Sequence, residues 1–406
     1  MPRTGFSPKS ALILFACCGA PFADAFAIVL AGGALLDLAP GAHASGAIAG
    51  SYMLGSLAGA WLLGRLSDRL GRRPLFLAAP AFAILASLFL AFMTEPAATG
   101  AALWALVAGR FLFGLFLGGD YPASQAMASE LLPAALRSRG LTVLMLAWYA
   151  GALLAVATMP LLLGCGSWFL WSLAPMLVIA PFLFARAFLP ESPEWLAHRT
   201  RARAEGLAGA RVRFSREDWK RIGFVFGFWL CQIIPSTAIF FFGPAILAAL
   251  QEGGGSQSGT LLLFYAVFFV GAAAALPLVP RLPRVKILVW TFALMALGLA
   301  IPAVTASVTV SALGFALFAL CYALQSVLDF VYPGELFGTG VRAGAIGLIT
   351  TAVRIGSALC AWLFPAGVMA LGMPAMMAGG AAVCAVGLLF SRCFGVEILK
   401  QPSEEA

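Results

Sequence analysis

The most informative stretch of the chain is Gly64-Arg-Leu-Ser-Asp-Arg-Leu-Gly-Arg-Arg73, because it concentrates four arginines and an aspartate between two long apolar runs. The run 38–64 before it and the run 74–94 after it contain no lysine, arginine, aspartate or glutamate. A membrane helix needs about 20 mostly apolar residues, and both runs are long enough. The stretch is therefore predicted to be a short charged connection between two membrane helices.

The composition of the whole chain agrees with a membrane protein. Of its 406 residues, 62% are hydrophobic and only 10% are charged, whereas a soluble domain carries about 25% charged residues. This excludes a soluble globular protein and a disordered chain. Runs without charge mark most of the twelve predicted spans. Those at 38–64, 74–94, 222–251 and 253–280 hold one span each, and those at 140–185, 287–328 and 355–391, which break near 163–168, 302–311 and 372–374, hold two each. Two further spans are predicted near 10–36 and 101–128.

The basic residues predict the orientation. If the N-terminus is cytoplasmic, all but two of the 25 lysines and arginines fall at cytoplasmic loops, helix ends or tails, as the positive-inside rule requires. The two exceptions, Arg110 and Arg354, lie within spans. We therefore predict a multi-pass protein of the inner or plasma membrane with both termini in the cytoplasm. The net charge of +8 reflects this topology, and no nucleic-acid partner is expected.

An internal repeat divides the chain. The spacing from Glu130 to Arg137 equals that from Glu335 to Arg342. The two glutamates are 205 residues apart, which is about half the chain. We predict an all-α membrane protein whose twelve transmembrane helices form two pseudo-symmetric six-helix bundles. The first covers 1–189, a linker covers 190–221, and the second bundle with a short tail covers 222–406. Such parallel repeats are a transporter architecture with the substrate site between the halves.

Several motifs resemble those of one protein family. The stretch Gly64–Arg73 resembles the signature loop of the major facilitator superfamily in every defining position. The segments 109–122, 190–196 and 332–335 are similar to motifs of its sugar-porter-like branch, which includes metabolite–proton and phosphate–proton symporters. The resemblance implies transport by alternating access. Phosphate is not implied as the substrate, because Ala27 stands where the phosphate symporters carry a second acid.

Ionisable residues within the spans are the best site candidates, since each costs about 2.5–3.5 kcal/mol at a helix centre. They are Asp24, Arg110, Asp120, Asp329 and Arg354. At 1.5 Å per residue, Asp24 and Arg110 lie at similar depths and could meet. Burial disfavours the charged form of a carboxylate, so an acid exposed alternately to the two sides can carry a proton.

The resemblance extends to two of these acids, because the family's proton symporters carry acids at the positions of Asp24 and Asp120. The structural alternative is a static Asp24–Arg110 ion pair, with Asp120 in a cytoplasmic latch. Tyr149, Gln232 and Gln325 complete the candidates for proton coupling or substrate binding, and Gln325 occupies the repeat-equivalent place of Asp120.

A second group of candidates lies at the cytoplasmic ends of the spans. We expect Glu130 to pair with Arg137, and Glu335 with Arg342, as gate pairs. The predicted cytoplasmic gate consists of Gly64, Asp68, Arg69, Gly71, Arg72, Arg73, Glu130, Arg137, Glu191, Glu335 and Arg342.

The sequence therefore predicts a secondary active transporter that moves a small polar metabolite, such as an organic acid or a sugar, by proton symport. An efflux antiporter or an uncoupled facilitator of the same fold is the alternative. No nucleophile motif, zinc-binding HExxH or Walker pattern occurs, so we expect no enzyme, catalytic residue, metal site or cofactor. The expected partners are the small-molecule substrate, protons and the lipid bilayer, and the expected state is a monomer.

Overall fold

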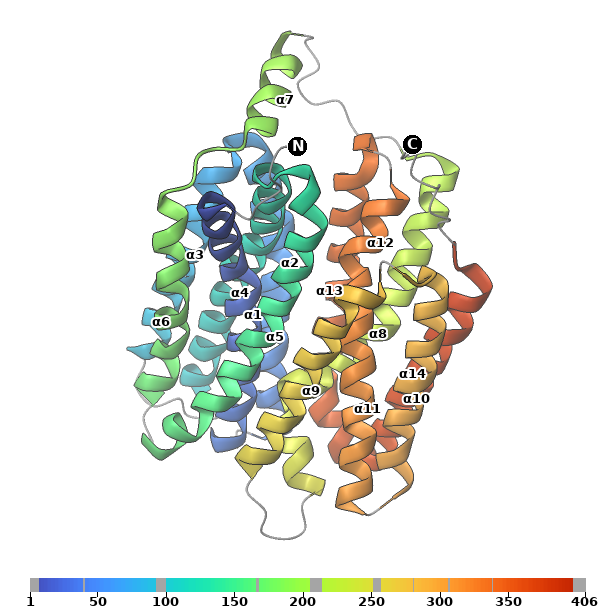
Figure 1. The fold of residues 1–406 in the computed structure, drawn as a ribbon. Helices are drawn as coiled ribbons and strands as arrows, with labels where there is room; N and C mark the ends of the chain where they lie inside the picture. Colours follow the sequence, from blue (N-terminus) through green and yellow to red (C-terminus); the bar gives the residue numbers. More distant parts are fainter. Residues whose placement is uncertain are drawn as a thin grey trace.

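The computed structural model describes residues 7–38, 41–92, 100–165, 168–204, 214–250, 257–279, 281–305, 307–337 and 339–396. Some side chains within these ranges are not described, among them those of Asp68 and Arg342. The described residues fold into long helices that stand side by side in two groups (Figure 1).

Helices α1 to α6 form the N-terminal half and α8 to α14 the C-terminal half, and α7, which lies between them in the sequence, projects beyond the N-terminal half at one end of the molecule (Figure 1). Their bounds are α1 Pro8–Leu38, α2 Ala42–Leu70, α3 Arg72–Ala91, α4 Gly100–Leu131, α5 Ala134–Cys165, α6 Trp168–Ala187, α7 Pro193–Ala204, α8 Arg216–Leu250, α9 Gln257–Leu278, α10 Arg284–Val304, α11 Val308–Ser326, α12 Leu328–Leu336, α13 Thr339–Leu371 and α14 Met373–Phe394.

Twelve of these helices are long and apolar enough to cross a membrane, which confirms the predicted all-α fold of two six-span bundles. The three long apolar runs each divide where the sequence predicted. Helix α5 ends at Cys165 and α6 starts at Trp168, α10 ends at Val304, and α13 ends at Leu371. Glycine and proline punctuation was therefore a sound guide to the helix ends.

Three local features differ from the sequence prediction. The signature stretch is almost entirely helical, since α2 continues to Leu70 and α3 begins at Arg72, which leaves Gly71 as the connection. The linker contains the helix α7. The tenth span is divided at Val327, a single residue with helical backbone angles (φ −63°, ψ −28°) between α11 and α12, and Asp329 lies in the first turn of α12.

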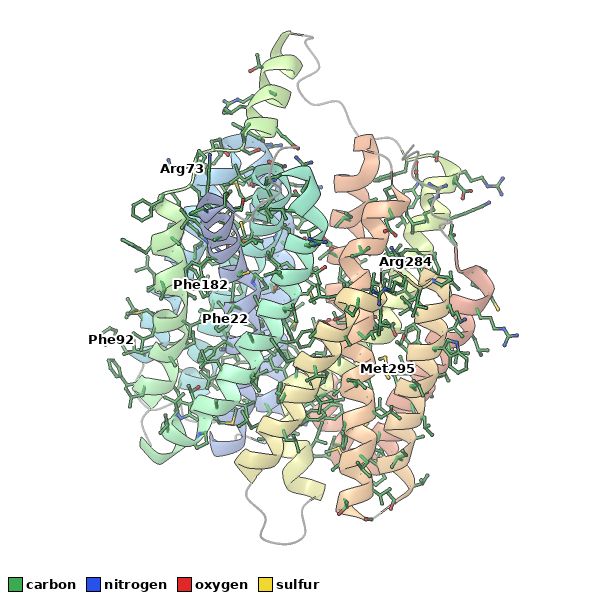
Figure 2. All side chains as sticks on the ribbon, in the orientation of Figure 1. Phe22, Arg73, Phe92, Phe182, Arg284 and Met295 are labelled. Carbon is green, nitrogen blue, oxygen red and sulfur yellow. The ribbon has the colours of Figure 1, made fainter. Side chains whose placement is uncertain are left out.

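Each half has its own core, and apolar side chains also cover the outside. Within the N-terminal half α2 packs on α4 and α1 on α5, and within the C-terminal half α10 packs on α11 and α14. Phe22 of α1 and Phe182 of α6 pack with ring centroids 5.5 Å apart (Figure 2). Phe92, in contrast, projects from the periphery and is 76% exposed (Figure 2). Exposed apolar side chains on a bundle of this kind face lipid.

The most extensive contacts between the two halves are those of α2 with α13, α5 with α9, and α1 with α8. We call the end of the molecule that carries α7 the α7 end (Figure 1). Near the opposite end, α2 and α13 are in very close contact. A Cβ added at Gly46 would lie 2.2 Å from the carbonyl oxygen of Trp362. Only glycine permits this approach, so the two halves are held together at the end opposite α7.

Candidate functional site

Asp24 lies in the middle of α1, buried where the two halves face each other, and is 5% exposed. The hydroxyl of Tyr52 donates to its Oδ1 at 2.6 Å, and the indole N–H of Trp148 donates to its Oδ2 at 3.1 Å. Both donors are neutral. Among the described residues, no lysine or arginine forms an ion pair with Asp24. The carboxylate is thus hydrogen-bonded but not neutralised.

Arg110 of α4 does not pair with Asp24, so the static ion pair considered from the sequence is absent from this conformation of the described chain. Its guanidinium carbon instead lies 4.9 Å from the ring centroid of Tyr52. The similar depth of the two residues was a sound inference, because both contact the same tyrosine. Tyr52 therefore separates the acid from the cation.

Aromatic and hydroxyl contacts join the halves around Asp24. Trp148 packs edge-on against Phe240 of α8 with ring centroids 4.6 Å apart. The hydroxyl of Tyr149 lies 2.7 Å from that of Ser326, at the end of α11 where the tenth span is interrupted. The immediate neighbours of the carboxylate would therefore have to move if the halves changed their relative position.

Arg354 of α13 also contacts the opposite half. Its guanidinium donates to the hydroxyl of Ser56 on α2 and lies 5.9 Å from the ring centroid of Tyr121 on α4. This predicted site residue thus lies at the contact between halves.

A chain of hydrogen bonds crosses the C-terminal half and ends at Asp329. Thr291 donates to Gln325 Oε1 at 2.6 Å, Gln325 donates to Gln232 Oε1 at 2.7 Å, and Gln232 donates to Asp329 Oδ2 at 2.8 Å. The Oδ1 atom of Asp329 is buried and has no hydrogen-bond partner. Three sequence candidates are thus brought together by α8, α11 and α12, with one carboxylate oxygen unpaired.

Asp120 has a different environment from the other two acids. Its Oδ1 accepts from Arg186 of α6 at 2.6 Å, and both side chains are 1% exposed. Arg186 donates further to the carbonyls of Ala16 and Phe76 and to the hydroxyl of Ser124. This closed network holds the Asp120 carboxylate in a buried ion pair, which sets it apart from Asp24 and Asp329.

The predicted gate residues pair within each half at the α7 end, and the pairs differ from those expected. Glu130 lies 3.5 Å from Arg72 at the start of α3, while Arg137 lies 2.5 Å from Glu194 of α7. The expected Glu130–Arg137 pair was wrong, because the turn after α4 directs Arg137 towards the linker.

The C-terminal half contains a matching ion pair. Glu335 of α12 lies 2.8 Å from Arg284, the first residue of α10 (Figure 2). The expected partner, Arg342, has a side chain outside the described ones. Each half thus joins the end of one helix to the start of another through one arginine and one glutamate.

Glu191 caps the start of α3. Its carboxylate accepts from the backbone N–H groups of Arg72 and Arg73 at 3.1 Å, where a helix N-terminus favours negative charge. Gly71 has φ of 125° and a Cβ there would lie 2.4 Å from Glu191 Oε2. Arg73 in turn donates to the carbonyl of Leu189 at 2.8 Å (Figure 2). These contacts explain why the signature stretch needs glycine and why Glu191 accompanies it.

The remaining members of the predicted gate contribute less. Arg69 is exposed and Gly64 has no atom within 4 Å of an added Cβ. The side chain of Asp68 lies outside the described ones, so its predicted latch role is not addressed by these contacts.

Sequence reasoning missed four residues that the structure places at these sites: Tyr52, Trp148, Arg186 and Ser326. Tyr52 and Trp148 are aromatic residues in apolar runs, which usually indicate core packing. Arg186 stands at the end of a span, where a basic residue is expected from topology alone. A tyrosine or tryptophan on one helix is a weak signal for a contact with an acid on another helix, and nothing in the spacing singles these residues out.

Comparison with known proteins identifies the family. The family model for the sugar (and other) transporters matches residues 36–210 and 211–406, so it covers both halves. This chain belongs to that family. It is a multi-pass transporter of the major facilitator superfamily and not an enzyme.

Relatives of this transporter are found over its full length. It is 30% identical to the putative metabolite transport protein YaaU of Escherichia coli over 97% of this chain and 93% of that protein. It is 28% identical to the inner membrane metabolite transport protein YgcS of the same organism over 99% and 94%.

Solved structures share the fold. The xylose transporter XylE from E. coli, in a partially occluded inward-open conformation, superposes with a TM-score of 0.82 at 17% identity, over 96% of this chain and 99% of that one. The human organic anion transporter MFSD10 superposes with a TM-score of 0.70 at 17% identity, over 95% and 100%.

Proposed function

We propose that this transporter imports a small polar metabolite together with protons, and that Asp24 and Asp329 are the acids that carry them. Import occurs by alternating access, in which the space between the halves opens first to one side of the membrane and then to the other. The orientation expected from the basic residues places the α7 end in the cytoplasm. The close contact of Gly46 with Trp362 then closes the external end in this conformation.

The observation that carries the proposal is the environment of Asp24. An ionisable side chain buried inside a membrane bundle without an ion-pair partner is costly to place there and usually has a functional role. Its two hydrogen-bond donors, Tyr52 and Trp148, can serve either form, since a protonated carboxyl retains an acceptor oxygen. Trp148 also packs against Phe240 of the other half. Separation of the halves would therefore change the surroundings of the acid, which is what coupling requires.

Asp329 supports the proposal from the C-terminal half. Its unpaired Oδ1 can hold a proton without breaking the hydrogen bond from Gln232 to Oδ2. In its charged form, Oδ2 accepts the same hydrogen bond from Gln232. Both protonation states are thus accommodated. Asp120 is not included, because its ion pair with Arg186 leaves no such freedom.

Uptake by proteoliposomes tests this function. A radiolabelled screen of organic acids, sugars and aromatic acids first identifies a transported compound. Asp24→Asn is then compared with wild type for accumulation driven by an imposed proton gradient and for exchange without a gradient. We expect accumulation to be lost while exchange persists, because exchange needs the conformational change but not net proton movement.

A matched variant makes the result specific. Glu217→Gln changes an exposed acid at the start of α8 and should leave accumulation unchanged. If Asp24→Asn and Asp329→Asn both accumulate the compound as wild type does, the two acids do not couple transport. If a protonophore leaves wild-type uptake unchanged, the protein is an uncoupled facilitator.

A further inference from the structure

Arg110 is the most unusual cation in the described part of the chain. It is 8% exposed, yet its Nε and Nη2 atoms have no hydrogen-bond partner. Buried polar groups in proteins are almost always paired, and a charged one is especially costly to leave unpaired. The contact with the Tyr52 ring supplies no hydrogen bond, so the edge that carries Nε and Nη2 remains unused.

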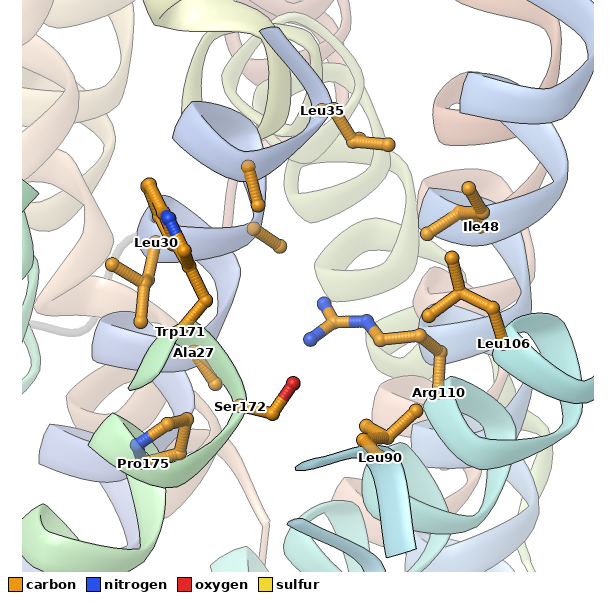
Figure 3. Close-up of a pocket in the computed structure, with 12 residues that line it drawn as sticks. Ala27, Leu30, Leu35, Ile48, Leu90, Leu106, Arg110, Trp171, Ser172 and Pro175 are labelled. Atoms are coloured by element: carbon orange, nitrogen blue, oxygen red, sulfur yellow. The ribbon is translucent and has the colours of Figure 1, made fainter. Parts of the chain in front are cut away.

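The unused edge points into a cavity of about 50 Å³. In Figure 3, Arg110 of α4 reaches into this space from one side, with Trp171 and Ser172 of α6 on the other. All the lining residues belong to the N-terminal half, and Leu35 and Ile48 lie near the end opposite α7. The indole N–H of Trp171, which is 5% exposed, also has no hydrogen-bond partner. Two unpaired, buried donor groups therefore line one cavity.

The repeat indicates that the fold does not require this arginine. The repeat offset of 205 residues places Phe315 in the C-terminal half at the position equivalent to Arg110, and Phe315 is a buried core residue. An apolar side chain is thus sufficient for packing at this depth. The cation is a specific feature of the N-terminal half.

From this geometry we propose that Arg110 and Trp171 bind the carboxylate of a small organic monoanion, and that the transported substrate belongs to this class. The substrate assignment rests on the proposed function, whereas the binding site does not.

The chemistry of the donors favours a carboxylate over other groups. Nε–H and Nη2–H lie on the same edge of a guanidinium and point in parallel, which matches the two oxygens of a carboxylate. A cavity of this size holds about four water molecules at about 10–15 Å³ each. This is close to the space that a carboxylate group with one or two further carbons needs. The remaining walls are mostly apolar, as Leu30, Leu90 and Leu106 show, so a dianion or a hydroxyl-rich sugar finds too few partners.

The site lies beside the proposed coupling acid. Tyr52 contacts Arg110 with its ring and Asp24 with its hydroxyl. A bound carboxylate cancels the positive charge of Arg110, which lies across Tyr52 from Asp24. Anion and proton can then enter the N-terminal half together as a neutral pair.

Binding is tested on the purified full-length protein in detergent by thermal shift, with propionate and its neutral isostere propionamide at equal ionic strength. Because a ligand stabilises only the state that binds it, we expect propionate to raise the melting temperature and propionamide not to. Arg110→Gln should weaken the apparent affinity for propionate at least tenfold. The control Arg392→Gln, which removes an exposed arginine at the end of α14, should stay within twofold of wild type.

Two further variants keep the test decisive if Arg110→Gln does not fold. Ala34→Leu fills the cavity from α1 without touching the arginine and should abolish the propionate effect while the protein remains folded. Trp171→Phe removes one N–H with little change in shape and should weaken binding several-fold.

Equal shifts with propionate and propionamide, or a propionate effect that survives both Arg110→Gln and Ala34→Leu, would overturn the site. So would competition by chloride at the same concentration as propionate, since that indicates a site for any small anion. In the uptake screen, accumulation of carboxylates but not of their amides supports the substrate class. Accumulation of a neutral sugar that is unaffected by Ala34→Leu overturns it. Propionate binding without any gradient-driven uptake would leave the site intact and refute the proposed function.

Discussion

The ion pair between Asp120 and Arg186 offers a quantitative test of the N-terminal core. Asp120→Asn leaves the charge of Arg186 buried without its counter-charge, and loss of one partner of a buried pair costs about 3–5 kcal/mol. For a cooperative unit of about 150–250 residues, each kcal/mol shifts the melting temperature by about 2–4 °C. The N-terminal half, Pro8–Ala187, falls in that range, so we expect a fall of about 6–20 °C.

The assay is thermal unfolding of the purified protein in detergent, with two companion variants. Replacing both partners, Asp120→Leu with Arg186→Met, removes the unpaired charge and should recover at least half of the loss. Recovery stays incomplete because Arg186 also donates to the carbonyls of Ala16 and Phe76. Glu217→Gln removes a similar charge from an exposed pair with Arg221 and should change stability by less than about 0.5 kcal/mol.

Two results would refute this reasoning. The first is an Asp120→Asn protein that melts within about 1 °C of wild type, since the pair would then contribute nothing despite its burial. The second is a double variant that is no more stable than Asp120→Asn. If Asp120→Asn also accumulates substrate normally once folded, its role is structural, as its contacts indicate.

Three further predictions concern the contacts between and within the halves. Gly46→Ala forces α2 away from Trp362, because the added Cβ would lie 2.2 Å from a carbonyl oxygen. It should raise the rate at which a thiol reagent labels cysteines near the end opposite α7, and an unchanged rate contradicts the closure of the halves at that end. Gly71→Ala combines an unfavourable φ of 125° with a clash against Glu191, and should destabilise the protein by about 1–3 kcal/mol, measured as a lower melting temperature; an unchanged one would mean that the turn adapts freely. Tyr52→Phe removes the 2.6 Å hydrogen bond to the buried acid and should lower gradient-driven accumulation more than exchange, whereas an equal loss of both would indicate a general structural defect.

The sequence predicted the architecture well because the relevant signals are local. Apolar runs of span length, and breaks such as Gly372-Met-Pro374, depend on residues close in the chain. The expected all-α fold of twelve spans in two halves was therefore confirmed. The interruption at Val327 was not predicted, since no glycine or proline marks it.

The site was less predictable because its contacts join distant residues. Asp120 and Arg186 are 66 positions apart, and Asp24 meets Trp148 across 124 positions. The equal spacing of Glu130 to Arg137 and of Glu335 to Arg342 predicted pairs along the chain. The described structure instead pairs the two glutamates with the starts of neighbouring helices. Four of the ionisable residues in apolar runs, Asp24, Arg110, Asp120 and Asp329, are buried, but their partners depend on how the helices pack.

The two corresponding ion pairs, Arg72 with Glu130 and Arg284 with Glu335, have a mechanical consequence. Neither pair joins one half to the other, so both can stay intact when the halves rotate relative to each other. The contacts of α2 with α13, α5 with α9 and α1 with α8 are then the ones that such a rotation must change.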